Sequence, residues 1–294
     1  MRARINATIT ASVLALCPLG SAAQSLPLPA PTASASVTPA ASASVAPTAP
    51  SDPCTSLSSL VSRPTFSTAA CAVKEGDLLL ESGYTNLTSS GAGGSSLITF
   101  PQGNLRVGLG RNVEFDLNPQ SAAYLSGAPR QVGITDGSIG LKYEIGYSSR
   151  LLYGVNALYT LPVGSANVFS ANGDGVLANL NGAFTLSPNV GLFATFGYNA
   201  QNAGTIGAPA RYHDYQPSLG ASVSLPANFY VFLEGFGVSS IGPGLGGRYG
   251  YDTGFQKDIG SRVQLDFNYF NYLGVQNGQH QHSVGFGAAY LIGS

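Results

Sequence analysis

Charged side chains are rare in this sequence, and many of them alternate with apolar residues along stretches that could form strands. Charged residues make up 9% of the chain, against roughly 25% in an ordinary soluble domain. Charges that share one face of a sheet can pair with one another, attract ions or bind a polar solute. The candidates are Glu81, Arg106, Glu114, Asp116, Lys142, Glu144, Glu234, Arg248, Asp252, Arg262 and Asp266.

Two kinds of chemistry are open to these charges. Arg106 stands close in sequence to Glu114 and Asp116 across a short segment, which predicts a structural ion pair. Asp252 and Asp266 would face each other in the simplest hairpin register, where like charges repel. That pair predicts an acidic patch that attracts cations or tunes the passage of a solute, whereas charges satisfied by one another would have only a structural role.

The sequence gives little support to an enzyme, a metal site or a nucleotide site. His213, His280 and His282 fall at loops or their margins, which favours solvent exposure over metal binding. The glycine-rich stretch 242–247 is followed by a strand pattern, although a dinucleotide site needs a helix there. No G-x-S-x-G motif occurs, and a net charge of -1 provides no basic face for nucleic acid. We therefore expect no enzymatic activity, no cofactor, no metal and no nucleic-acid partner.

The elements that would position the charges are strands, because a two-residue period dominates after Gly76. Short and long connections alternate between these strands. The predicted strands are 77–86, 97–109, 112–124, 137–147, 150–161, 176–186, 189–199, 214–225, 228–239, 247–257, 261–272 and 283–292. The predicted short turns are 110–112, 148–150, 187–189, 226–228 and 258–261, and the predicted long connections are 87–96, 125–136, 162–175, 200–213, 240–246 and 273–282.

Alternating loop lengths are typical of an up-and-down barrel in the bacterial outer membrane. A soluble sandwich would not sort its loops in this way, and its outer faces should be charged. The sequence therefore predicts an all-β fold, a transmembrane antiparallel up-and-down β-barrel of about 12 strands. Its apolar face would contact the lipid bilayer and its charged face would line the lumen. In the stretch 261–272 the expected lipid-facing residues are Val263, Leu265, Phe267 and Tyr269, the lumen-facing ones are Arg262, Gln264, Asp266 and Asn268, and aromatic girdles would include Tyr147, Tyr198 and Tyr272.

The first quarter of the chain is organised differently. Two arginines, an apolar stretch and small residues predict a signal peptide over 1–23, so the chain would be exported. Residues 24–53 are rich in Ala, Pro and Ser, which predicts a disordered tether. Cleavage would remove Cys17 and leave Cys54 and Cys71, an even count that favours a disulfide in an oxidising compartment. Residues 54–75 would then be a disulfide-tied lead-in to a barrel over 76–294.

Several motifs from Cys54 onward resemble those of a family of outer-membrane β-barrel transporters labelled for the meta-pathway of phenol degradation. The stretches are "SRPTFSTAACAVKEGDLLLESGYTN", "FPQGNLRVGL", "DGSIGLKYEIGYS", "YTLPVGS", "LEGFG", "GLGGRYGYDTGFQKDIGSRVQLD" and "VGFGAAY". The resemblance implies a twelve-stranded barrel and uptake of small hydrophobic or aromatic molecules. It implies no catalytic residues.

The expected function is passive passage of a small solute across the outer membrane, including aromatic or hydrophobic solutes. Twelve strands lie between the number that side chains fill and the number that leaves an open channel. A structural or adhesive surface barrel with a plugged lumen is the alternative, and a lipid-modifying barrel enzyme is the third. The expected partners are the lipid bilayer, a small-molecule solute and the outer-membrane assembly machinery.

Overall fold

The computed structural model describes residues 52–91, 93–110, 112–127, 130–166, 169–205, 208–243, 246–273 and 280–293. All of them belong to one compact unit, Ala49–Ser294. The predicted signal peptide and nearly all of the predicted tether lie outside the described residues.

Strands make up almost all of this unit, after two short helices at its start. The helices are η1 (Pro53–Thr55) and α1 (Leu57–Leu60). The strands are β1 (Leu78–Ser90), β2 (Ser95–Phe100), β3 (Asn104–Gly110), β4 (Val113–Asn118), β5 (Ala122–Ser126), β6 (Gln131–Ile134), β7 (Gly137–Tyr147), β8 (Leu151–Leu161), β9 (Gly175–Ser187), β10 (Val190–Thr205), β11 (Ala208–Leu225), β12 (Phe229–Val238), β13 (Arg248–Ile259), β14 (Val263–Leu273) and β15 (His280–Ile292). Among the described residues, no helix is long and apolar enough to cross a bilayer.

Three of the barrel strands are interrupted. β2 pairs with Thr85–Ser89 of β1, and β3 pairs with Leu78–Glu81 of β1, so β2 and β3 together form one barrel strand. The break between them contains Pro101, which has no backbone N–H to donate to the ladder. β4 with β5, separated by Pro119, and β6 with β7 form the next two barrel strands in the same way. The fifteen segments therefore make twelve barrel strands.

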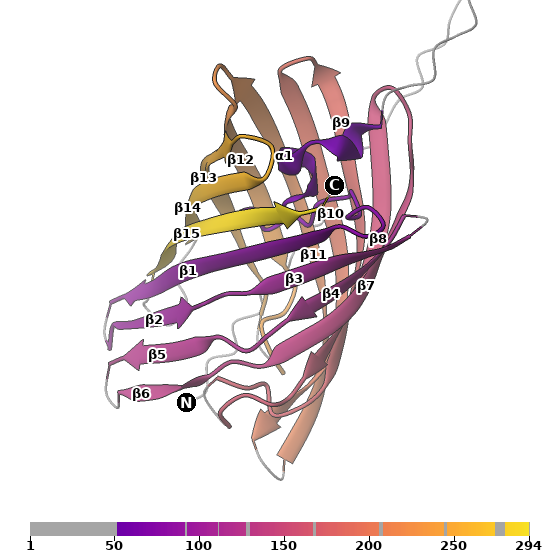
Figure 1. Ribbon diagram of the computed structural model, residues 1–294. Coiled ribbons are helices and arrows are strands. Elements are labelled where there is room, and N and C mark those ends of the chain that lie inside the picture. The colour runs from indigo at the N-terminus through magenta and orange to yellow at the C-terminus, as the bar shows by residue number, and fades with distance from the viewer. Residues whose placement is uncertain are drawn as a thin grey trace, which may run out of the picture. The chain divides into compact units, whose positions relative to one another are not determined.

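Antiparallel pairing between the first and last strands closes the barrel. β1 pairs with β15 along its whole length, from Leu78 opposite Ile292 to Ser90 opposite His280. In Figure 1 the yellow β15 accordingly lies beside the indigo β1. Closure pairs the edges of β1 and β15, which hydrocarbon would not tolerate unpaired, whereas the short strand β6 pairs with β5 alone among the described strands. The predicted all-β, up-and-down barrel of twelve strands is confirmed.

Side chains alternate between the two faces of the barrel as the two-residue period predicted. In β7, Leu141 is 55% exposed, whereas the neighbouring Lys142 is 2% exposed. In β14, Leu265 is exposed, whereas Gln264 and Asp266 are buried. Because the exposed positions are apolar and the buried ones are polar, the outer face suits lipid and the inner face suits water and ions.

Short turns join the strands at the five predicted places, at the end of the barrel where β1 begins and β15 ends. The turn residues Asn112 (φ 66°) and Gly260 (φ 68°) have left-handed backbones, which asparagine and glycine adopt most readily. In outer-membrane barrels the short turns face the periplasm. We therefore call this end the periplasmic end.

The connection between β10 and β11 is much shorter than the predicted loop 200–213. β10 continues to Thr205 and β11 begins at Ala208. The Tyr212 hydroxyl donates to Gln201 Oε1 at 3.3 Å, and the Tyr198 hydroxyl lies 2.8 Å from His213 Nδ1. These cross-strand pairs stabilise a longer hairpin than the loop-forming residue types suggest. Long and short connections thus do not alternate as strictly as the sequence predicted.

Candidate functional site

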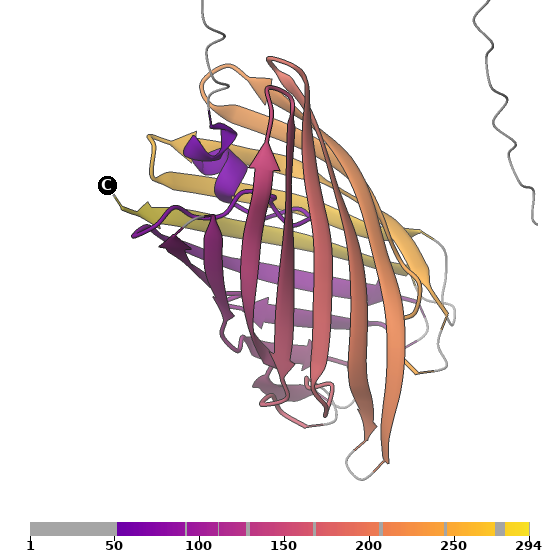
Figure 2. The ribbon, with the colours of Figure 1, turned by 90° about the vertical axis from the view of Figure 1, so that its right-hand side faces the viewer.

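Residues 52–75 lie inside the barrel, and we call this segment the plug. Leu57, Leu60 and Val73 of the plug are buried, and they pack in one cluster with Leu79 of β1 and Leu152 of β8. In Figures 1 and 2, α1 lies at the same end of the barrel as the C-terminal end of β15, which is the periplasmic end. The lead-in predicted from the sequence therefore occupies part of the lumen.

The plug is a short folded loop held by a covalent bond. Asp52 caps η1, since its Oδ1 accepts a hydrogen bond from the Cys54 backbone N–H at 2.8 Å. Cys54 and Cys71 form a disulfide across 17 residues, which confirms the predicted bond. Both cysteines are buried, and Lys74 also pairs with Asp52 at 3.1 Å. The ends of the loop are thus held together while its middle extends into the barrel.

Carboxylates on the inner wall accept hydrogen bonds from backbone N–H groups of the plug. The plug is irregular over much of its length, so these N–H groups have no partners in a helix or a ladder. A charged acceptor makes such bonds stronger than neutral ones. The bonds are Arg63 N to Glu81 (3.1 Å), Phe66 N and Ser67 N to Glu234 (2.8 and 2.9 Å), Ala72 N to Glu144 (3.3 Å) and Val73 N to Glu114 (2.6 Å).

Arg106 of β3 is the centre of a buried ionic cluster that joins the wall to the plug. Its Nε lies 2.7 Å from Glu114 Oε1, and its Nη1 lies 2.9 Å from Glu81 Oε1. Asp116 lies 3.7 Å from Arg106, and Lys142 lies 3.3 Å from Glu114. The guanidinium also donates to the backbone carbonyls of two plug residues, Leu60 and Cys71. The pair predicted at the β3–β4 hairpin therefore forms, and it also binds the plug.

Arg63 extends a charge from the plug to another part of the wall, formed by β14 and β15. Its Nη2 lies 3.5 Å from Asp266 Oδ1 and donates to the Phe286 carbonyl at 3.2 Å. The guanidinium lies against Gly83 and Gly287, where an added Cβ would be 2.2 and 2.4 Å from guanidinium atoms. Arg63 was not among the residues predicted from the sequence, because no strand pattern surrounds it.

Replacing Gly108 by alanine is expected to displace the end of the plug. A Cβ at Gly108 would lie 1.7 Å from the Lys74 carbonyl oxygen, a backbone atom that cannot rotate away. We expect a loss of roughly 1–3 kcal/mol in the free energy of unfolding, as for other overpacked sites, and faster hydrogen exchange at Ala72 and Val73. The control is Gly235→Ala, since a Cβ there meets nothing within 4 Å. Equal exchange in the two variants would contradict the close contact.

A cluster of aromatic rings lies inside the barrel beside the plug. Phe66 of the plug stacks on Phe236 at 4.7 Å between ring centroids, and Phe236 stacks on Phe270 at 4.6 Å. Tyr272 packs edge-on against Phe270, and the Arg248 guanidinium lies 5.2 Å from its ring centroid. Tyr272 was expected in an interfacial girdle, but it shares the inward face of β14 with Asp266. Alternate residues of β14 point inward, and this alternation, not the position of Tyr272 near the end of the strand, determines the direction of its side chain.

The expected Asp252–Asp266 patch does not form. In the observed register Asp252 lies opposite Glu234 and Phe270, whereas Asp266 lies opposite Gln256. The β13–β14 turn lies further along the chain than the simplest register assumes, since Ile259 pairs with Val263, and this moves the two aspartates apart along the strands. Asp252 instead accepts a hydrogen bond from Asn268 Nδ2 at 3.2 Å.

Arg262 also differs from its expected place. It is exposed in the turn before β14, where its guanidinium donates to the Gly293 carbonyl at 3.0 Å. It therefore lies at the periplasmic rim rather than on the inner face of a strand. The other ten charged candidates belong to strands. Their role in solute passage remains a proposal.

The described residues offer little to a metal ion. Among them, one group of potential ligand residues lies close enough together, Cys54, Cys71 and Glu144. The two cysteines form a disulfide, so neither sulfur is a thiolate that could bind a metal. His213 stacks on Tyr198, and His282 stacks on Tyr269. His280 and His282 lie in β15 and not in a loop as expected.

A closed antiparallel barrel with an apolar outer face and a polar, plugged interior is an integral protein of the bacterial outer membrane. No model of a protein family matches the sequence, and neither does any curated protein. The resemblance to the family labelled for phenol degradation is therefore not confirmed and stays a proposal.

Several solved barrels are distantly similar to this chain. The NanC porin is 11% identical over 71% of this chain and 98% of its own, with a TM-score of 0.49. The KdgM porin in complex with disordered oligogalacturonate is 10% identical over 71% and 98%, with a TM-score of 0.45. The CymD monoaromatic hydrocarbon channel is 12% identical over 76% and 89%, with a TM-score of 0.43. Identities and TM-scores this low do not indicate which solute this protein would carry.

Proposed function

We propose that this protein is an outer-membrane channel for the passive passage of small solutes, and that the plug sets the width of its narrowest part. The observation that carries the proposal is a cavity of about 330 Å³ between the plug and the wall formed by β8 to β13. The plug is bound on its other side by the Arg106 cluster. Because the plug leaves this space on one side, the barrel is narrowed rather than filled.

Aromatic or hydrophobic solutes are the class that we propose for the channel. The rings of Phe236, Phe270 and Tyr272 supply an apolar surface inside an otherwise polar lumen. Such rings stack on flat solutes. The resemblance of several sequence motifs to the phenol-degradation family points the same way.

Recording from planar lipid bilayers tests the channel against its main alternative. Purified full-length protein is expected to give small, discrete conductance steps, and the same membranes without protein should give none. The plug itself favours the second candidate, a structural or adhesive barrel with a sealed lumen. Such a barrel would give no steps at any voltage, and that result would overturn the channel.

A further inference from the structure

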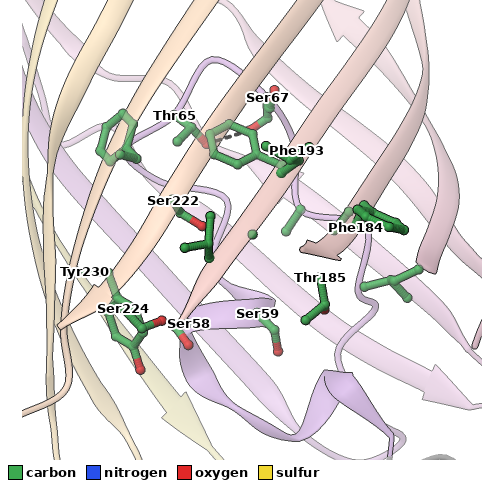
Figure 3. Close-up of a pocket in the computed structure, with 18 of the residues that line it drawn as sticks. Ser58, Ser59, Thr65, Ser67, Phe184, Thr185, Phe193, Ser222, Ser224 and Tyr230 are labelled. Atoms are coloured by element: carbon green, nitrogen blue, oxygen red, sulfur yellow. Dashed lines mark hydrogen bonds between the residues drawn. The ribbon is translucent and has the colours of Figure 1, made fainter. Parts of the chain in front are cut away.

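The cavity between the plug and the wall has a chemistry of its own, distinct from that of the charged cluster. None of the described residues that line it is charged. The plug contributes hydroxyl side chains, including Ser58, Ser59 and Thr65, and the wall contributes Thr185, Ser222 and Ser224. Figure 3 shows these hydroxyls distributed around the cavity.

For part of this hydroxyl lining, the described residues supply no hydrogen-bond partner. Among the described residues, no hydrogen bond involves the side-chain hydroxyls of Thr185, Ser222 or Ser224. Each can therefore donate to and accept from a molecule in the cavity. Phe193 adds an apolar ring, which lies close to Gly220, where a Cβ would be 2.3 Å from the ring.

We infer that this cavity binds an uncharged, hydroxyl-bearing solute of the size of a single six-membered ring. Its volume lies at the lower end of the range of about 300–1,000 Å³ for small-molecule sites. An ion entering the cavity would lose water and touch no side chain of opposite charge, which is costly. A neutral solute would replace its water with the free hydroxyls and pack against Phe193. The inference rests on the proposed channel and concerns the charge and the hydroxyl groups of the solute, not whether its ring is aromatic, so sugars can serve as probes.

Three sugars of similar size and different charge test the inference in proteoliposome swelling. We expect glucose to enter several-fold faster than glucuronate, an anion, and glucosamine, a cation. Equal rates for all three would overturn the inference and leave the channel intact. No entry of any of them, together with no conductance in bilayers, would instead overturn the channel itself.

Two variants at Ser222 locate the selection within the cavity. Ser222→Asp is expected to raise the rate of glucosamine relative to glucose several-fold, because it places an anion among uncharged neighbours. Ser222→Asn, which matches the aspartate in size but is uncharged, should raise the rate of glucosamine relative to glucose much less than Ser222→Asp does. Leu219→Trp, on the lipid face of the same strand (64% exposed), controls for general disturbance of β11. An unchanged preference in Ser222→Asp would place the selection elsewhere and overturn the inference.

Discussion

Replacing Arg106 by methionine is expected to destabilise the protein by about 3–5 kcal/mol, the usual cost of breaking a buried ion pair on one side. Methionine fills similar space but removes the cation that pairs with Glu81 and one of the two that pair with Glu114. It also removes the donor to the plug carbonyls of Leu60 and Cys71. Chemical denaturation in lipid vesicles measures the loss.

Hydrogen exchange separates a loosened plug from a generally weakened barrel. In Arg106→Met the backbone amides of Arg63 and Val73, which donate to Glu81 and Glu114, should exchange faster than those of β10 and β11. Adding Glu81→Gln to this variant should recover part of the stability, because it removes one unpaired carboxylate. Equal stability of Arg106→Met and the wild type would contradict the claim that the Arg106 cluster stabilises the fold and holds the plug.

Replacing Leu141 by arginine is expected to cost about 2–4 kcal/mol, because this outward side chain would place a charge among lipid tails near the membrane midplane. Val132 is 77% exposed in β6, close to the end of the barrel opposite the short turns. The cost of Val132→Arg should therefore fall to about 0–1 kcal/mol. Folding of both variants into vesicles of defined thickness measures the difference. Equal costs would mean that Leu141 does not face the bilayer core.

The strands were predictable because the two faces of the barrel meet different solvents. In β7 and β14 this contrast repeats at every second residue, and the inward and outward sets follow from the sequence alone. The interruptions at Pro101 and Pro119 could have been inferred from the missing N–H groups. The register was harder to predict, because displacing a turn along the chain shifts the pairing without changing which face a side chain occupies, as Asp252 shows.

The individual contacts of the plug with the barrel wall could not be predicted, because they follow no period in the sequence. The plug's backbone N–H groups bind single carboxylates from strands far apart in the sequence, such as Glu81 and Glu234. A signal was nevertheless present. Buried carboxylates outnumber buried basic groups on the inner face. Carboxylates that have no cation beside them need other hydrogen-bond donors, and here backbone N–H groups of the plug supply them. The disulfide was predictable from its cysteine count and compartment.

The most direct test of a plug that narrows a channel compares the single-channel conductance of the wild type with that of Cys54→Ser/Cys71→Ser in planar bilayers. On the chain-entropy model the disulfide stabilises the folded plug by roughly 3 kcal/mol relative to the unfolded segment. Without the disulfide, the plug should therefore leave its position more often. We predict small steps for the wild type and larger, more variable steps for the double variant. Identical conductance in the two proteins, or none in either, would contradict the claim that the plug narrows an open channel.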